Sequence, residues 1–324
     1  MRYPGEWEPH ERTIMGWPCR TELWGPGLEQ ARADYAEVAN AIADFEDVTM
    51  IAGSAEDARA ARGACTSRVA IVELPIDDSW LRDSSPIYVV DDAGGRLANH
   101  FGFNAWGEKF PPWDKDAAIG ALIARELGDE VRPVPMVLEG GSVISDGAGA
   151  IITTEQCLLA KNRNPSLSQS AIEELLVEYL GAERIVWLGQ GLVEDRDTDG
   201  HVDLIAAVTP DRRVLVQTVP ERNPNHENCA ENVERLHDAG FETIAVPHLP
   251  YADVAGERVA AGYLNLYVCN GAVIVPVTEA EYDEEALAII AGAFPGRAVV
   301  PVPGATLAYG GGGPHCITQQ VPAT

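Results

Sequence analysis

Hydrophobic residues in this chain follow two alternating patterns, one that predicts helices and one that predicts short buried strands. Apolar positions that recur every three or four residues are typical of an amphipathic helix, whereas short apolar runs between turn residues are typical of strands. The helical pattern covers residues 28–44, the alanine-rich segment 57–62, and residues 116–127, 168–180, 228–239 and 284–292. The strand pattern covers residues 48–52, 69–74, 87–90, 97–103, 134–138, 142–145, 150–153, 184–188, 204–208, 243–246, 263–268, 272–275 and 298–301.

Turn residues separate these segments. The Asp- and Gly-rich stretch 91–95 predicts a hairpin, and Asn270-Gly271 predicts a two-residue turn between the strands on either side of it. Gly181 and Gly240 follow predicted helices and are expected to end them, because glycine readily adopts the left-handed conformation of a helix C-terminus.

The order of the elements indicates the fold class. Two strands, a helix and a further strand recur at intervals of roughly 60 residues, without repetition of the residues themselves. This alternation predicts an α/β protein. No low-complexity stretch or linker divides the chain, so residues 1–324 are expected to form a single domain.

The charge of the chain limits its partners. Acidic residues number 50 and basic residues 23, which makes the net charge −27 over 324 residues. Nucleic acid and anionic membranes would be repelled by such a surface, whereas a cationic small molecule would be attracted. No apolar run approaches the ~20 residues needed to cross a bilayer. The N-terminus also lacks the apolar stretch of a secretory signal, so a cytoplasmic protein is expected.

The cysteines are widely spaced and form no paired motif, which argues against a disulfide framework or a zinc ribbon. The default interpretation for most of them is a small buried apolar residue. They are Cys19, Cys65, Cys157, Cys229, Cys269 and Cys316.

An acidic loop at 194–199 precedes His201 and Asp203. Its aspartates match the first half of a calcium-binding loop, but Ala206 stands where that loop requires a glutamate, so calcium is a weak interpretation. His201 and Asp203 alternate ahead of the apolar run 204–208, and in a strand they would project to one face. An imidazole beside a carboxylate there suggests proton transfer next to a group that holds a cation.

Two further segments place polar side chains at the ends of apolar runs. Trp80 and Asp83 lie in the polar stretch 77–83, and an aromatic face with a carboxylate suits a planar cation. Glu139 follows an apolar run and precedes two glycines, which allow close approach of the backbone to a site. A simple turn at the end of a strand explains Glu139 equally well.

Cys316 differs from the other cysteines in its surroundings. Four glycines at 310–313 and His315 precede it, so no side chain crowds the sulfur from that direction. A phosphate-binding loop is excluded because no Gly-Lys-Ser/Thr follows. This setting favours a nucleophilic thiol, for which a distant His201 is as good a partner as the adjacent His315.

Taken together, these motifs resemble those of the agmatine deiminase family, within the peptidyl-arginine-deiminase-like guanidine-modifying enzymes. The resemblance runs in order through almost the whole chain. It implies a pentein α/β-propeller fold, with five ββαβ-like units around a pseudo-fivefold axis. The matching stretches are residues 6–13, 78–83, 103–114, 138–142, 200–203 and 310–320.

The resemblance also implies roles for individual residues. Cys316 resembles the family's nucleophile and His201 its general acid and base. Asp83 and Asp203 correspond to the carboxylates that bind the guanidinium, Glu139 to the glutamate beside the catalytic histidine. Trp80 corresponds to a wall of the pocket.

The implied reaction is hydrolysis of agmatine to N-carbamoylputrescine and ammonia, on the route to putrescine, and it needs no cofactor or metal. Attack by Cys316 leaves a covalent amidino-cysteine, and His201, kept charged by carboxylates such as Glu139, protonates the departing ammonia. The acidic loop, Asp197 in particular, is expected to hold the substrate's ammonium. Arginine would instead require a cation such as Arg163 or Arg196 for its carboxylate.

Two other functions remain open from the sequence. One is deimination of free arginine or another guanidino compound, and the other is a non-catalytic module that binds guanidines. In each case the expected partner is a small cationic guanidino molecule rather than nucleic acid or a membrane. Assembly into a homo-oligomer is left open.

Overall fold

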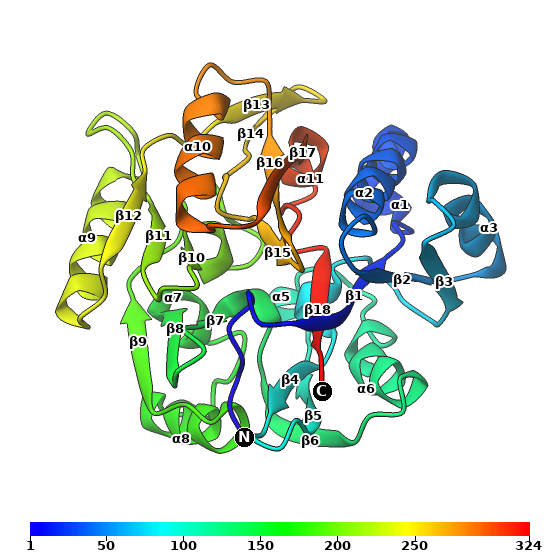
Figure 1. Ribbon diagram of the computed structural model, residues 1–324, viewed down its shortest axis with the longest axis horizontal. Coiled ribbons are helices and arrows are strands. Elements are labelled where there is room, and N and C mark those ends of the chain that lie inside the picture. Colours follow the sequence, from blue (N-terminus) through cyan, green and yellow to red (C-terminus); the bar gives the residue numbers. More distant parts are fainter.

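The computed structural model describes residues 1–324, arranged as several small sheets with helices outside them (Figure 1). Four sheets share one hydrogen-bonding pattern, in which the first two strands pair antiparallel and the third joins in parallel. They consist of β4 (Ile87–Val90), β5 (Arg96–Gly102) and β6 (Val131–Val137); β7 (Val143–Ser145), β8 (Ala150–Thr154) and β9 (Arg184–Leu188); β10 (Ala206–Val208), β11 (Val214–Gln217) and β12 (Thr243–Val246); and β15 (Tyr267–Cys269), β16 (Ala272–Val277) and β17 (Ala298–Pro303).

A fifth sheet brings the two ends of the chain together. The C-terminal strand β18 (Thr318–Pro322) pairs antiparallel with the N-terminal strand β1 (His10–Gly16). Parallel pairing with β2 (Asp47–Ala52) and then β3 (Val69–Glu73) completes the sheet in the order β18-β1-β2-β3. The same antiparallel-then-parallel pattern therefore occurs five times, the last time across the chain ends.

The longer helices connect the strands of each sheet and lie at the periphery of the view in Figure 1. They are α2 (Leu28–Ile42), α3 (Ala55–Ala64), α6 (Asp116–Glu126), α8 (Gln169–Leu180), α9 (His226–Asp238) and α10 (Asp283–Ala293). Each corresponds to a helix that the apolar spacing predicts. None of the helices is both long enough and apolar enough to cross a membrane.

Short helical segments and one hairpin occupy the connections. The hairpin is formed by β13 (Tyr251–Val254) and β14 (Glu257–Ala260). The short helical segments are α1 (Thr21–Trp24), η1 (Gly25–Gly27), α4 (Leu81–Ser84), α5 (Ala105–Glu108), η2 (Gly140–Ser142), α7 (Glu155–Leu158), η3 (Val202–Leu204) and α11 (Ala305–Tyr309).

The predicted turns and helix ends are largely confirmed. Asn270 and Gly271 connect β15 to β16, and Gly271 has a φ of 83°. At the start of α8, the Ser168 side chain accepts a hydrogen bond from the Ala171 amide, and Gly181 ends this helix in the left-handed conformation.

Two predicted strands are wrong at their N-terminal ends. His201 precedes the turn η3 instead of beginning a strand, and β10 starts only at Ala206. Likewise, residues 263–266 are not part of a strand, because β15 starts at Tyr267. The pattern did not predict β1, β11, the β13–β14 hairpin or β18. Polar or charged residues interrupt the apolar positions of β1, β18 and the hairpin strands, and the apolar run of β11 is too short to predict a strand.

The hydrophobic core is divided into several clusters, one of which lies beneath α8. Leu176 is fully buried in that cluster, whereas its neighbour Val177 is 49% exposed. Leu176 thus lies on the buried face of α8 and Val177 on its exposed face.

We expect Leu176→Ala to lower the free energy of unfolding by about 2–5 kcal/mol, because it leaves a cavity in the core. Val177→Ala, on the exposed face, should change the free energy of unfolding by no more than about 0.5 kcal/mol. Urea denaturation of both variants measures the difference. Equal effects would show that this face of α8 is not buried as described.

Candidate active site

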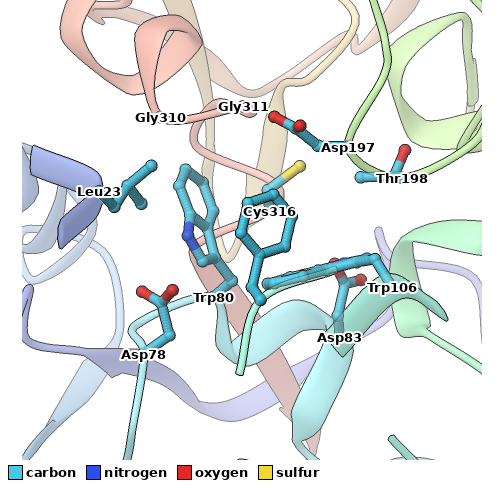
Figure 2. Close-up of a pocket in the computed structure, with 11 residues that line it drawn as sticks. Leu23, Asp78, Trp80, Asp83, Trp106, Asp197, Thr198, Gly310, Gly311 and Cys316 are labelled. Carbon is cyan, nitrogen blue, oxygen red and sulfur yellow. The ribbon is translucent and has the colours of Figure 1, made fainter. Parts of the chain in front are cut away.

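Residues from the connections between separate sheets meet at a pocket with about 380 Å³ of space around it, part of which is open to solvent. In the view of Figure 2, Trp80 and Trp106 lie on either side of Cys316, with Asp197 above it and Asp83 below. Aromatic side chains supply much of the wall, and acidic side chains supply its charge. Such a pocket suits a flat cation carried on an apolar chain.

Each of the five sheets contributes a residue from the segment just ahead of its first strand. Asp83 precedes β4, Glu139 precedes β7, Asp203 precedes β10, Asn265 precedes β15 and Cys316 precedes β18. The repeated topology thus delivers side chains that are far apart in the sequence to one place.

Asp83 lies in the short helix α4 and is almost fully buried. Its Oδ1 accepts a hydrogen bond of 2.8 Å from the Gly141 amide, and its Oδ2 accepts one of 2.9 Å from Trp106 Nε1. Burial raises the pKa of Asp83 above its ordinary value, and nearby carboxylates add to this effect. The carboxylate is therefore held in place but is short of a cationic partner.

Asp203 is held by one oxygen and leaves the other free. Its Oδ2 lies 2.7 Å from His315 Nδ1 and 3.4 Å from the sulfur of Cys316. Its Oδ1 is buried without a hydrogen-bond partner. Burial by itself would raise the pKa of Asp203, but the hydrogen bond and the charge of His315 lower it below the ordinary value. The free oxygen of an ionised Asp203 is thus available to a ligand.

His201 lies between the two aspartates. Its Nδ1 is 3.9 Å from Asp83 Oδ1 and 3.9 Å from Asp203 Oδ1, and both ring nitrogens are buried without a hydrogen-bond partner. Gly141 makes this arrangement possible, because a Cβ there would lie 2.6 Å from His201 Nδ1. Unpartnered ring nitrogens beside unsatisfied carboxylate oxygens leave a polar site that a ligand with several N–H groups can fill.

Glu139 lies near His201, as predicted, but its charge is already balanced. The Glu139 Oε1 is 2.5 Å from Arg163 Nε, and both side chains are about 1% exposed. Arg163 also donates to Asp199 and to the Thr198 carbonyl oxygen. The carboxylate that Glu139 presents near His201 is therefore one half of a buried ion pair.

Cys316 is 3% exposed and contacts Asn265 twice. Asn265 Nδ2 donates to the sulfur at 3.1 Å, and Asn265 Oδ1 accepts from the Cys316 amide at 3.2 Å. Burial raises the pKa of the Cys316 thiol well above its ordinary value, and Asp203 and Asp83 raise it further. Without a cation in the pocket, Cys316 is accordingly a neutral thiol at physiological pH.

The glycines before Cys316 make room for the aromatic wall and for the sulfur. A Cβ at Gly312 would lie 2.8 Å from the sulfur and 2.8 Å from Trp80, and a Cβ at Gly310 would lie 2.3 Å from Trp24. Trp24 stacks on Trp80 with ring centroids 6.1 Å apart. A larger residue at either position would displace the wall or the nucleophile.

The acidic loop is not the cluster of free carboxylates that the sequence suggested. Of its four acids, only Asp197 lines the pocket. Asp195 accepts hydrogen bonds from the backbone at Thr198, Gly200 and His201, which fixes the approach to His201. The remaining two acids bind elsewhere. Glu194 accepts from Tyr251 and Asn225, and Asp199 pairs with Lys109 and Arg163.

These partners also bear on metal binding. Because the loop carboxylates face different partners, they do not converge as a calcium loop requires. The side chains of Glu139, Cys157 and His201 do come within 4.8 Å of one another. Arg163 already occupies the Glu139 carboxylate, so this group is a poor cation site.

Three residues that contact the proposed catalytic groups have no role that the sequence predicts. Asn265 is the polar residue of an otherwise apolar segment, and this contrast is the sequence feature that could have identified it as a site residue. Trp106 and Glu6 lie in stretches that match the family, but only their contacts with Asp83 and His315 show what they do.

Comparison with known proteins agrees with this architecture. The sequence profile of the Porphyromonas-type peptidyl-arginine deiminase family matches residues 2–322. The agmatine deiminase of Pseudomonas aeruginosa is 40% identical, over 100% of this chain and 96% of its own length. The chain therefore belongs to the Porphyromonas-type peptidyl-arginine deiminase family.

Solved structures show the same fold. The agmatine deiminase of Enterococcus faecalis superposes with a TM-score of 0.95 at 31% identity, covering 99% of this chain and 96% of its own. A Cys-to-Ser variant of the C. jejuni agmatine deiminase with substrate bound gives a TM-score of 0.92 at 28% identity, over 99% and 96% of the chains. An amidinotransferase from Microseira wollei, at 12% identity and a TM-score of 0.59, shares the fold alone. The predicted α/β class is thus confirmed.

The high pKa of Cys316 has a direct chemical consequence. Because the thiolate is the reactive form, alkylation of Cys316 by iodoacetamide should continue to accelerate above pH 9 instead of levelling off near pH 8.5. Asp83→Asn removes one of the charges that raise this pKa, so it should speed alkylation at pH 8, by on the order of tenfold.

Mass spectrometry of the peptide that contains Cys316 measures the rate. The peptide that contains Cys157, a fully buried cysteine, serves as an internal control and should remain unmodified. A plateau below pH 8 in the wild-type chain would contradict the proposed thiol state.

Proposed function

We propose that this protein is an agmatine deiminase that hydrolyses the guanidinium group of agmatine to N-carbamoylputrescine and ammonia through a covalent intermediate on Cys316. The observation that carries the proposal is the meeting of a thiol, an imidazole and two carboxylates, Asp83 and Asp203, at one aromatic pocket. Relatives that bear this name, at about 40% identity over the whole chain, support it.

Substrate binding follows from the unsatisfied atoms of the pocket. A guanidinium has N–H groups on every edge, and carboxylates on two sides can accept them in pairs. Asp83 and the free Oδ1 of Asp203 provide these acceptors, while Trp80 faces the planar cation. Rigid placement of the cation positions its central carbon for attack by the sulfur of Cys316.

The bound cation also activates the nucleophile. Asp83 and Asp203 raise the pKa of Cys316 in the unliganded pocket, and a guanidinium between them offsets that charge. The thiol then loses its proton to solvent, and the thiolate forms a bond to the guanidinium carbon. Substrate binding and nucleophile activation are therefore coupled, and the free enzyme keeps its cysteine protonated.

His201 moves the protons of both half-reactions. As the carbon–nitrogen bond breaks, the His201 imidazolium gives its proton to the leaving nitrogen, which departs as ammonia and leaves an S-alkylthiouronium. Neutral His201 then takes a proton from water, whose oxygen attacks the same carbon. The carbon–sulfur bond breaks, and the ureido product is released. Charge develops on nitrogen, so proton donation suffices and no cofactor is invoked.

The far end of the pocket favours agmatine over arginine. Asp197 lines the pocket and can face the ammonium of agmatine. Arginine carries a carboxylate at that end and would need a free cation. Arg163 is buried against Glu139 and Asp199, and Arg196 is exposed and does not line the pocket. Deimination of free arginine is consequently the less favoured alternative.

We propose for the fold that the five sheets surround a pseudo-fivefold axis as a propeller within one catalytic domain, residues 1–324. The fivefold recurrence of the strand pattern and the pairing of β1 with β18 support this arrangement. A cytoplasmic location stays a prediction from the sequence, and assembly into a homo-oligomer stays open.

The first test of the proposed function is replacement of the nucleophile. Cys316→Ser should lose essentially all ammonia release from agmatine while still binding it. The pKa of a serine hydroxyl is too high for it to form the anion that attacks the guanidinium carbon. His201→Asn should also abolish turnover. Cys229→Ala, a buried cysteine in another cluster, should leave kcat unchanged. Full activity of Cys316→Ser would refute the covalent mechanism.

A second test concerns the choice of guanidine. Asp197→Asn should raise the KM for agmatine about fivefold with a modest change in kcat, because the amine end does not change during the reaction. Glu194→Gln is the matched control, since Glu194 belongs to the same loop but does not line this pocket. Steady-state kinetics on both substrates decide: a kcat/KM for arginine equal to or above that for agmatine would exclude the substrate assignment.

A further inference from the structure

A largely buried row of alternating charges leads to the active site. Arg82 Nη1 lies 3.4 Å from Glu6 Oε1, and the same oxygen lies 2.7 Å from His315 Nε2. The other ring nitrogen of His315, Nδ1, lies 2.7 Å from Asp203 Oδ2. The row therefore runs Arg82, Glu6, His315, Asp203, and it ends on a carboxylate of the proposed guanidinium site.

The geometry of His315 defines its protonation state. Each of its two ring nitrogens faces a carboxylate oxygen at 2.7 Å, and a neutral imidazole could donate to only one of them. Burial and the charge of Arg82 oppose the imidazolium, whereas Glu6 and Asp203 favour it, and the net effect raises the pKa of His315. The pKa of Glu6 is lowered to about 2, since His315 and Arg82 outweigh its burial.

The mostly apolar surroundings strengthen the interactions between these charges. Glu6, His315 and Asp203 border a small cavity whose other lining residues are mostly apolar. Charges act strongly on one another in such a poorly solvated setting, and the loss of one partner leaves the next charge uncompensated.

The hydrogen bond from His315 also sets the orientation of Asp203. It engages Oδ2, so that Oδ1 is the oxygen left without a partner, 3.9 Å from His201 Nδ1. A charged donor at Oδ2 in addition keeps the carboxylate ionised, since it favours the anionic form.

We propose that Glu6 and His315 are positioning residues: Glu6 keeps His315 as an imidazolium, and this cation holds Asp203 ionised with Oδ1 turned toward the substrate guanidinium. The inference rests on the proposed function for the identity of that substrate. It assigns part of the machinery to the N-terminal segment, 309 residues away from His315 along the chain and ahead of the first strand.

Glu6→Gln tests the proposal, because it keeps a hydrogen-bond acceptor and removes the charge. The pKa of His315 should then fall, and above that pKa a neutral His315 can still donate to Asp203 but no longer compensates its charge. Relative to wild type, kcat/KM for agmatine should therefore be nearly unchanged at pH 6 and reduced about tenfold at pH 9, mainly through KM.

Two variants are controls. Glu8→Gln removes a neighbouring glutamate that pairs with Arg2 outside the site, and its ratio to wild type should stay near one at every pH. Glu6→Asp keeps the charge and should show no added dependence on pH, even where the shorter side chain lowers activity uniformly. A merely structural role for Glu6 predicts a loss in Glu6→Gln that is the same at every pH, and that result would overturn the proposal.

A measurement without substrate separates this inference from the proposed function. In histidine-labelled protein, the NMR signal of His315, identified by its absence in His315→Asn, should remain that of an imidazolium beyond pH 8 in wild type. In Glu6→Gln it should titrate at least one pH unit lower. A neutral His315 at pH 7 in wild type would overturn the inference, whatever the activity. Failure of wild type to hydrolyse agmatine would instead overturn the proposed function.

Discussion

Repulsion between buried negative charges is the interaction on which this site depends. Asp83 and Asp203 lie close to the Cys316 thiol in a setting where burial makes every uncompensated charge unfavourable. His315 donates a hydrogen bond to Asp203, and neutral groups donate hydrogen bonds to Asp83. His201 lies 3.9 Å from both carboxylates. A ligand with a delocalised positive charge offsets the repulsion between these carboxylates. The same charge lowers the pKa of the Cys316 thiol.

The fold meets this requirement by collecting single residues from repeated units. Each of the five sheets with the repeated strand pattern begins with a strand whose preceding residues lie at the site, so five separate segments each deliver one group. The pairing of β18 with β1 brings the last of these five groups, Cys316, to the site. Through it, Cys316, near the end of the chain, comes to the same region as Glu6, near the beginning.

Glycine determines how closely these groups approach. Gly141 allows His201 to lie between the two aspartates, and Gly312 allows the sulfur to lie against Trp80, because a Cβ at either position would overlap the neighbouring atoms. Arg163 affects the charge of the site through its ion pair with Glu139. It neutralises Glu139, so that the aspartates that face the pocket, and not the glutamate, carry the charge that a guanidinium meets.

Local patterns in the sequence were sufficient for the elements whose stability is local. The long helices, the turn at Asn270-Gly271 and the alternating α/β order follow from apolar spacing and turn chemistry, which act over a few residues. The motifs were likewise sufficient to select Asp83, His201, Asp203 and Cys316 as candidates. Tertiary packing decided the rest, since the partner of a buried charge is set by whichever chain segment lies beside it. That is why Asp197 is the one acid of that loop that lines the pocket, why Glu139 is paired with Arg163, and why Glu6 contacts His315.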